Sequence, residues 1–305
     1  MRPWLRVAVA ACCAACAGSG GTPRAAVPTP APAAGSLPDA ATAPTAAPVT
    51  PKRSDLIRYG PSAVRYVVHR QLHIQQALGE QTQAQSVGAR IFVAAAITGP
   101  ADSIGYPATF VVDSIVPDSG TPAPIVDNVS KVRKLVFAGR VAPRGEFVNA
   151  VASDSTVAQS VVQLLGNFRD FLPRLPSEGL RPGSAWTDTV ETTQKGSGAE
   201  VSRHAITLAT AAAWKPSPNG GDVHFADLRI TGSQTYRVTG GGRNAGQPFE
   251  LAGTGSGSGV NYIGADGRYL GGEWQDSTTL TVRLPVQGVS VPVVQVTHIS
   301  VTVLP

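Results

Sequence analysis

The chain has 305 residues, of which 42% are hydrophobic, 15% charged and 6% aromatic. The charged fraction is well below the usual quarter, which argues against a coiled coil or a highly charged disordered protein. No run of eighteen apolar residues is present to form a spanning helix. The net charge of +5 arises mostly in residues 1–53, whereas residues 54–305 carry 20 basic and 19 acidic side chains. A nearly neutral body without a basic face gives no reason to expect a nucleic-acid partner.

The first residues have the pattern of a secretory signal. Arg2 and Arg6 form a positive start, and the apolar stretch 7–15 precedes small residues. All three cysteines of the chain lie here, at Cys12, Cys13 and Cys16. A disulfide framework or a cysteine metal site in the body of the protein is therefore excluded.

A cysteine that follows two alanines resembles the lipobox of bacterial lipoproteins. In that family the cysteine is lipidated and becomes the new N-terminus once the leader is removed. We expect residues 1–15 to be the signal peptide and Cys16 to be the lipid attachment site. Cys12 is the alternative, because Val9-Ala10-Ala11-Cys12 matches the lipobox better locally but leaves a short apolar region. An ordinary cleaved signal with incidental cysteines is the third interpretation.

Residues 16–53 differ in composition from the rest of the chain. From residue 17 to residue 53 the segment holds eight prolines, many alanines and no aromatic residue. It cannot bury enough apolar surface to offset its ordering entropy, so we expect a disordered tether. The globular part is then one β-rich domain over 54–305, held at a membrane by the lipid anchor.

From residue 54 onward the dominant hydrophobic period is two, which is the period of a β-strand. In 64–74 the apolar face alternates with a polar one, and 87–98 and 109–116 repeat the pattern. Residues 135–137 and 147–148 flank a turn predicted at 143–145. Later strands are expected at 185–193, 200–213, 222–231, 234–239, 247–259, 268–274, 277–284 and 289–304. The sequence predicts a type I′ turn at Asp266-Gly267 and a short link at 285–288, hence an antiparallel meander.

One segment, residues 156–172, has the helical period instead. Its apolar residues recur at steps of three and four, Asp154 or Ser155 is positioned to cap its start, and Pro173 ends it. The predicted fold is mainly β: one curved antiparallel meander sheet or half-barrel of about ten to twelve strands, with a single amphipathic helix packed on it.

The run 253–259 alternates four glycines with three hydroxyl residues. On a strand it would have one bare face, which permits strong bending or the close approach of another group. A flexible linker is the alternative, but the strand is favoured because residues 261–263 and the turn at 266–267 follow at once.

The search for catalytic and metal-binding motifs gives little. There is no G-x-S-x-G elbow, P-loop or dinucleotide fingerprint. His69 and His73 share the polar face of a strand about 13 Å apart, too far for one metal ion without a third element. His298 also lies on a polar face, whereas His204 and His224 have apolar neighbours that suit core histidines. The acids are scattered. We therefore expect no enzyme, no catalytic residue, no metal and no cofactor; an unrecognised hydrolase would need a Ser/His/acid cluster assembled from distant positions.

Several short motifs together resemble a known group of proteins. Asp113-Ser114-Ile115 ends a valine-rich strand, Leu172-Pro173 follows the helix, and 180–186 leads into a strand that begins near Trp186. The glycine-rich strand and Asp266-Gly267-Arg268-Tyr269-Leu270 complete the pattern. It resembles an uncharacterised family of bacterial envelope lipoproteins, a domain of unknown function, over most of 55–305. More loosely, the expected architecture is similar to the half-barrel of the carriers that shuttle acyl chains across the periplasm.

These observations lead to one functional expectation and one alternative. The protein is expected to be a membrane-tethered cell-envelope lipoprotein, facing the periplasm or the cell exterior, that binds an apolar or amphipathic ligand. The alternative is a structural or partner-binding envelope lipoprotein without a ligand. An apolar cavity on the concave face would favour the first, whereas a filled core with an exposed apolar patch would favour the second.

Overall fold

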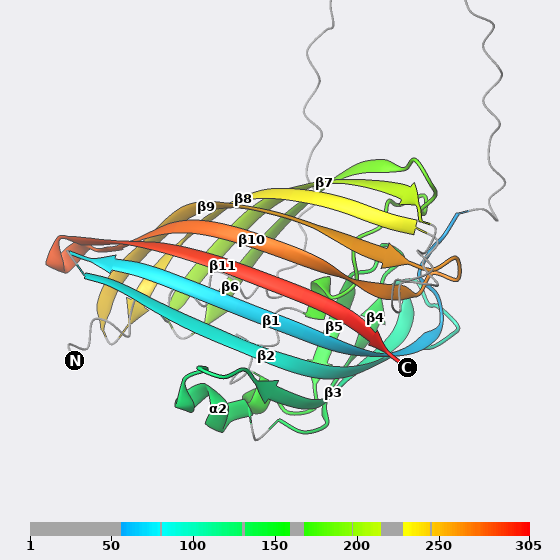
Figure 1. Ribbon diagram of the computed structural model, residues 1–305, viewed down its shortest axis with the longest axis horizontal. Helices are drawn as coiled ribbons and strands as arrows, with labels where there is room; N and C mark the ends of the chain where they lie inside the picture. Colours follow the sequence, from blue (N-terminus) through cyan, green and yellow to red (C-terminus); the bar gives the residue numbers. More distant parts are fainter. Residues whose placement is uncertain are drawn as a thin grey trace, which may run out of the picture.

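The protein forms one open, curved antiparallel sheet of eleven strands, as predicted (Figure 1). The computed structural model describes residues 56–79, 81–129, 132–158, 168–196, 198–214, 228–244 and 246–305. The strands are β1 Ser62–Leu78, β2 Gln81–Ile97, β3 Tyr106–Pro117, β4 Leu135–Val141, β5 Phe147–Ala152, β6 Ala185–Gly196, β7 Ala199–Ala213, β8 Leu228–Asn244, β9 Gln247–Ile263, β10 Tyr269–Leu284 and β11 Val289–Leu304. The short helical elements are α2 Ala123–Val129, η2 Phe168–Asp170 and η4 Pro285–Gln287. The predicted signal peptide and most of the predicted tether, with Cys12 and Cys16, lie outside the described residues.

The order of the strands divides the sheet into two arms. The order is β5-β4-β3-β2-β1-β11-β10-β9-β8-β7-β6. The chain starts in the middle at β1, runs outward to the edge strand β5, crosses to the other edge at β6 and returns to β11, which pairs with β1. We call β1–β5 the N-terminal arm and β6–β11 the C-terminal arm.

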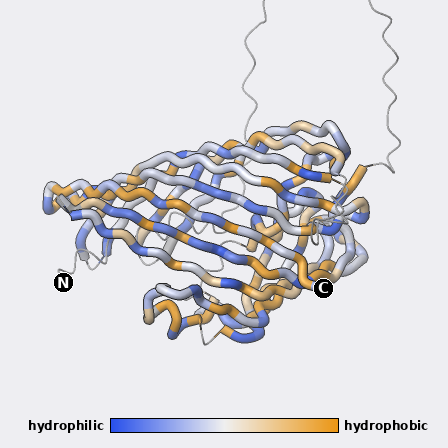
Figure 2. Tube along the Cα trace, viewed as in Figure 1, coloured by the Kyte–Doolittle hydropathy of each residue, from blue (hydrophilic) through white to orange (hydrophobic). Residues whose placement is uncertain are grey.

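Period-two alternation assigns each side chain to the inner, concave face or to the outer face. In β1 the predicted apolar positions, such as Tyr66, Leu72 and Ile74, are buried, whereas Arg65 and Gln71 are exposed. Figure 2 shows the same alternation of hydrophobic and hydrophilic residues along the strands. The inner face is therefore the one that carries the core.

Two strands are longer than the sequence pattern predicted. The segments expected at 234–239 and in the described part of 222–231 form one strand, β8, and those at 268–274 and 277–284 form β10. The hydrophobic pattern is interrupted at Gly232, but the strand continues there, because the ring of Trp274 fills the space left by the missing side chain. A glycine inside a strand can thus mark close packing instead of a strand end.

The turn at Asp266-Gly267 is present but is not of type I′. The Gly267 N–H donates to the carbonyl of Gly264 (2.9 Å), and the Gly264 N–H donates to the carbonyl of Arg268 (2.9 Å). Gly267 has φ of +79°, whereas Asp266 does not have positive φ. A type I′ turn needs positive φ at both central residues, so the connection is a type I turn followed by a glycine bulge.

The helix predicted at 156–172 lies largely outside the described residues. Its start is helical over 155–158, and the Val157 N–H donates to Asp154 Oδ1 (2.9 Å), which confirms the predicted cap. At the other end the chain forms η2. The structure also contains α2, which the sequence analysis missed; at seven residues it is too short to show a helical period.

The core of the N-terminal arm is built from aromatic rings. Phe110, which is fully buried, contacts the rings of Phe147, Phe168 and Phe171 at centroid distances of 4.7–5.6 Å. Edge-on and tilted contacts of this kind add to the stabilisation from burial. The inner face of this arm is therefore filled.

Candidate functional site on the concave face

The glycine run lies in β9 with its bare side facing inward. Gly253, Gly255, Gly257 and Gly259 occupy inner positions, and the intervening hydroxyl residues are exposed on the outer face. The strand interpretation of this run is therefore confirmed, and the linker alternative is excluded.

Large side chains from the neighbouring strands occupy the space above these glycines. A Cβ atom at Gly255 would lie 2.4 Å from the ring of Tyr236, and one at Gly259 would lie 2.6 Å from the ring of Trp274. At Gly257 it would lie 2.0 Å from Asp276 Oδ1. The glycines thus allow side chains of β8 and β10 to lie across β9.

A polar network covers the inner face of β7, β8 and β10. Arg203 Nη2 donates to Gln234 Oε1 (2.7 Å), and Gln234 Nε2 donates to Thr207 Oγ1 (2.8 Å). The Arg203 guanidinium also lies 3.9 Å from the ring centroid of Tyr236. The Tyr236 hydroxyl is 2.5 Å from Thr278 Oγ1. Hydrogen bonds and a cation–π contact therefore fix these side chains in place.

Asp276 is the acid beside this network, in the same cross-strand row as Gln234. Its carboxylate accepts a hydrogen bond from the Trp274 side chain, while burial raises its pKa above the usual value against the opposing effects of Trp274, Arg203 and Arg70. Oδ1 is buried and has no hydrogen-bond partner within the part of the chain that the structure describes. An acceptor enclosed without a donor is costly unless something else supplies one.

The inner face of the C-terminal arm is partly open to solvent. Trp186, Gln234, Trp274 and Asp276 are all half-buried, whereas the inner residues of β2 from Val87 to Ile97 and of β3 from Ala108 to Ile115 are buried. We call the inner surface of β6–β10 the concave trough. It combines indole rings with fixed hydrogen-bonding groups, which is the usual composition of a small-molecule site.

A cluster of charges joins the two arms across the open side of the sheet. Asp188 of β6, which is buried, accepts hydrogen bonds from Arg144 Nη2 (2.6 Å) and Arg174 Nη1 (3.3 Å). Arg144 belongs to the turn between β4 and β5, and Arg174 also pairs with Asp170 and Glu146. These ion pairs hold the edge strand of one arm against the last turn of the other.

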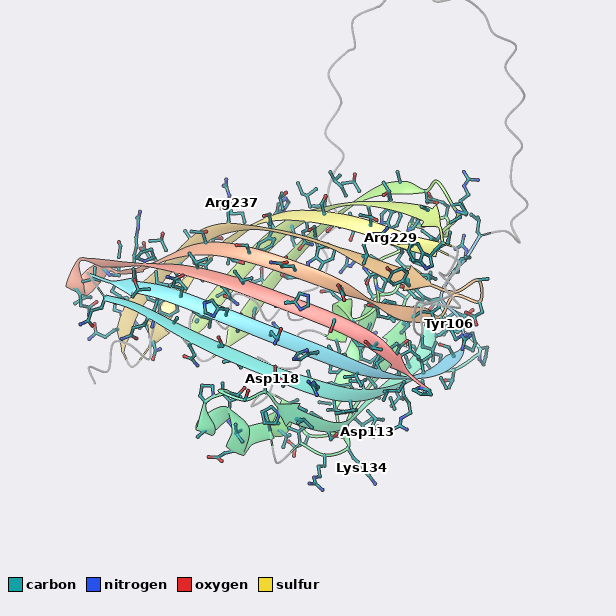
Figure 3. All side chains as sticks on the ribbon, viewed as in Figure 1. Tyr106, Asp113, Asp118, Lys134, Arg229 and Arg237 are labelled. Atoms are coloured by element: carbon teal, nitrogen blue, oxygen red, sulfur yellow. The ribbon has the colours of Figure 1, made fainter. Side chains whose placement is uncertain are left out.

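The predicted surface histidines gather in a groove on the outer face. The groove, about 670 Å³ in volume, is formed by β1, β2, β11 and the end of β3, and includes His69, His73 and His298. His69 Nε2 lies 2.8 Å from Asp118 Oδ2, and His73 Nδ1 lies 3.0 Å from Ser86 Oγ. Asp118 directly follows β3 (Figure 3). One histidine thus meets an acid and a different histidine meets a serine, so these contacts do not form a single Ser/His/acid triad.

The other two predicted histidines have different outcomes. His204 is exposed on the outer face and pairs with Glu191 (3.1 Å), so its assignment as a core histidine is wrong. The apolar residues Ile206 and Leu208 beside it are themselves exposed, which is why the local sequence was misleading. His224 lies outside the described residues. Over the described ranges, no group of three or more His, Cys, Asp or Glu side chains is arranged to hold a metal ion.

Comparisons with known proteins add little to this picture. No family model and no curated protein matches the chain. The solved structures found include OccK2 (OpdF) from Pseudomonas aeruginosa, at 8% identity over 80% of this chain and 98% of that one, with a TM-score of 0.25. A BenF-like porin from Pseudomonas fluorescens Pf-5 has 8% identity, coverages of 79% and 99%, and a TM-score of 0.23. A DUF1329 family protein from Desulfovibrio piger has 10% identity, coverages of 77% and 83%, and a TM-score of 0.13. Likenesses this weak assign neither family nor function.

Proposed function

We propose that the protein is a membrane-tethered cell-envelope lipoprotein that binds an amphipathic ligand in the concave trough and acts without catalysis. The observation that carries the proposal is the half-buried surface of Trp186, Trp274 and Gln234 on a face where the other arm is filled. A trough with rings and fixed polar groups suits a ligand that has both an apolar and a polar part.

The test of ligand binding is native mass spectrometry of protein purified from membranes. We expect a copurified small molecule that is depleted in Trp274→Ala. Gln275→Ala, one residue along β10 but exposed on the outer face, is the matched control and should retain it. Wild-type protein that carries no small molecule, or equal retention by both variants, would contradict the proposal.

The membrane tether rests on the sequence of residues 1–53. Acyl chains on Cys16 would supply the anchor. In the part of the chain that the structure describes, no helix is both long and apolar enough to cross a membrane. Cys16→Ser should release the protein from membranes, and Cys12→Ser should not. Release by Cys12→Ser alone would move the attachment site, and release by neither variant would contradict the lipoprotein assignment.

A second candidate function is docking of a strand from an envelope protein at β6. This edge strand pairs regularly with β7 along its twelve residues, whereas the other edge strand, β5, has six residues and an irregular register. Long regular edges can accept an added strand, and short bulged ones resist it.

Proline at an outward-facing position would test strand addition. The Ala211 N–H donates to the carbonyl of Ser184, which by alternation directs the N–H groups of even residues of β6 to β7 and those of odd residues outward. Thr189→Pro should therefore block an added strand and leave the β7 ladder intact. If crosslinking in envelope extracts captures the same partner with wild type and with Thr189→Pro, this candidate fails.

A further inference from the structure

Trp274 lies flat on bare backbone. Its six-membered ring passes over Gly259 of β9 and reaches Gly232 of β8: Cβ atoms at these positions would lie 2.6 Å and 3.1 Å from ring atoms. Gly259 and Gly232 are cross-strand partners, and Gly259 is the partner of Trp274 itself. Two glycines on adjacent strands therefore seat one indole ring parallel to the sheet.

A hydrogen bond fixes this ring in place, and polar side chains lie beside it. The Trp274 side chain donates to Asp276, so the ring cannot turn freely. The same cross-strand row continues through Ala209 to Trp186 on β6. The next row holds Asp276, Gln234 and Thr207, so each indole of the trough has hydrogen-bonding side chains beside it.

The composition of the trough discriminates between polar headgroups. An anionic phosphate would meet the carboxyl group of Asp276. The arginines on this side of the sheet already have partners, because Arg203 is held by Gln234 and Tyr236. Arg144 and Arg174 are held by Asp188. A quaternary ammonium group is usually held by a cage of several aromatic rings. A sugar ring has C–H bonds on its face, which suit the negative face of an indole, and hydroxyls at its edge, which suit carboxylate, amide and threonine groups.

We propose that the Trp274 platform binds a sugar ring, so that the ligand of the trough is an amphiphile with a glycosyl headgroup. This inference rests on the proposed ligand-binding function and specifies the chemistry of its polar part. The ring would stack on Trp274, with its hydroxyls exchanging hydrogen bonds with Gln234 and Thr207 along the adjacent row.

The experiment compares two amphiphiles that differ only in headgroup. Octyl β-glucoside and octyl phosphocholine are titrated into the folded protein below their critical micelle concentrations, by calorimetry. We expect the glucoside to bind at least about tenfold tighter, a difference of about 1.4 kcal/mol. Trp274→Leu should abolish this preference.

Two further variants separate the platform from general effects of substitution. Gly232→Ala pushes the ring by a few tenths of an ångström without meeting backbone closer than 3.9 Å, so it should weaken glucoside binding several-fold with the fold intact. Trp214→Leu is the control, because Trp214 packs with Tyr262 and Arg229 on the opposite face. Circular dichroism checks that all variants are folded.

The outcomes distinguish the two proposals. Equal binding of both amphiphiles, or a glucoside preference that survives Trp274→Leu, overturns the sugar inference and leaves the ligand-binding function standing. If neither amphiphile binds, the ligand-binding function fails, and maltotriose then decides the sugar inference alone. Trp274-dependent binding of maltotriose supports it, and absence of such binding overturns it.

Discussion

The two arms of the sheet share one strand pattern but have different interiors. In the N-terminal arm most inner positions of β2 to β5 carry aromatic or aliphatic side chains such as Phe110 and Phe147, and these are buried. In the C-terminal arm many of them carry glycine, threonine, glutamine or a half-buried tryptophan. Alternation alone therefore decides which side chains face inward, whereas residue size decides whether the inner face becomes a core or stays accessible.

The largest loss of stability should come from truncating an aromatic ring in the core of the N-terminal arm. Phe110→Ala removes a fully buried ring that contacts three others, and we expect the free energy of unfolding to fall by about 3–5 kcal/mol. Phe168→Ala, also buried in this cluster, should cost about 2–5 kcal/mol. Trp274→Ala in the trough should cost less, about 1–2 kcal/mol, because its ring is half-buried although it covers Gly232 and donates to Asp276. Urea denaturation measures all three; equal losses in both arms would contradict the comparison.

Breaking the junction between the arms should have a smaller effect. Asp188→Ala leaves Arg144 and Arg174 without their shared acid. Loss of one partner of a fully buried pair costs several kcal/mol, but the Arg144 side chain is 35% exposed, so we expect about 2 kcal/mol. Asp266→Ala, which breaks the exposed pair with Arg268, is the control and should cost about 0–1 kcal/mol. A loss for Asp188→Ala no greater than the control would show that the junction adds no stability.

The packing of side chains over the glycine run of β9 can be tested by adding a single methyl group. Gly255→Ala places a Cβ against the Tyr236 ring and should cost about 1–3 kcal/mol, as overpacking does. Ser256→Ala, on the exposed outer face of the same strand, should change stability by about 0.5 kcal/mol or less. Thermal unfolding of the two variants gives the comparison. A neutral Gly255→Ala would mean that the Tyr236 ring is not tightly held.

Two acids, one in each arm, should give opposite pH dependences. Burial raises the pKa of Asp276, so the folded state favours its protonated form, and stability is lost as pH rises from about 3.8 through the folded pKa. Hydrogen bonds from Arg140 and from backbone N–H groups lower the pKa of Asp102 to about 2, so its contribution is present above the unfolded value and lost as pH falls towards 2.

Denaturation midpoints across this pH range test the signs. Relative to wild type, Asp276→Asn should gain stability as pH rises, and Asp102→Asn should lose it. The effect at Asp102 should be small, since that residue is exposed and screened by solvent. Parallel profiles for wild type and Asp276→Asn would show that the Asp276 carboxyl is not perturbed by burial.

The period-two pattern was enough to predict the sheet. The prediction failed where contacts between strands, which the local sequence does not show, decide the structure. Alternation assigned the faces of β1 correctly because one face of that strand is buried. It failed at Gly232, where a side chain from two strands away fills the gap, and at His204, whose apolar neighbours are exposed. The trough depends on cross-strand register, such as Trp274 opposite Gly259, and nothing within either strand indicates that pairing.

The groove on the outer face is a second case in which the sequence of one strand does not predict a contact with another. His69 and His73 were placed on one polar face correctly, yet the partner of His69 is Asp118, 49 residues away, beyond the end of another strand. The space for that acid comes from Gly88, where a Cβ atom would lie 2.3 Å from Asp118 Oδ2. A glycine within a strand was thus the available signal, and it has meaning only once the neighbouring strand is known.

The pairing of β1 with β11 has a consequence for the order of synthesis. Of the strands that the structure describes, β1 is the first to be made and β11 the last, yet they are hydrogen-bonded neighbours in the middle of the sheet. At the usual rate of about 5–20 residues per second, roughly 10–40 s of elongation separate Leu78 from Val289. Throughout that interval one side of the seventeen-residue strand β1 has no native partner. Nascent chains are therefore vulnerable to mispairing at β1, and a holding chaperone would find its target there.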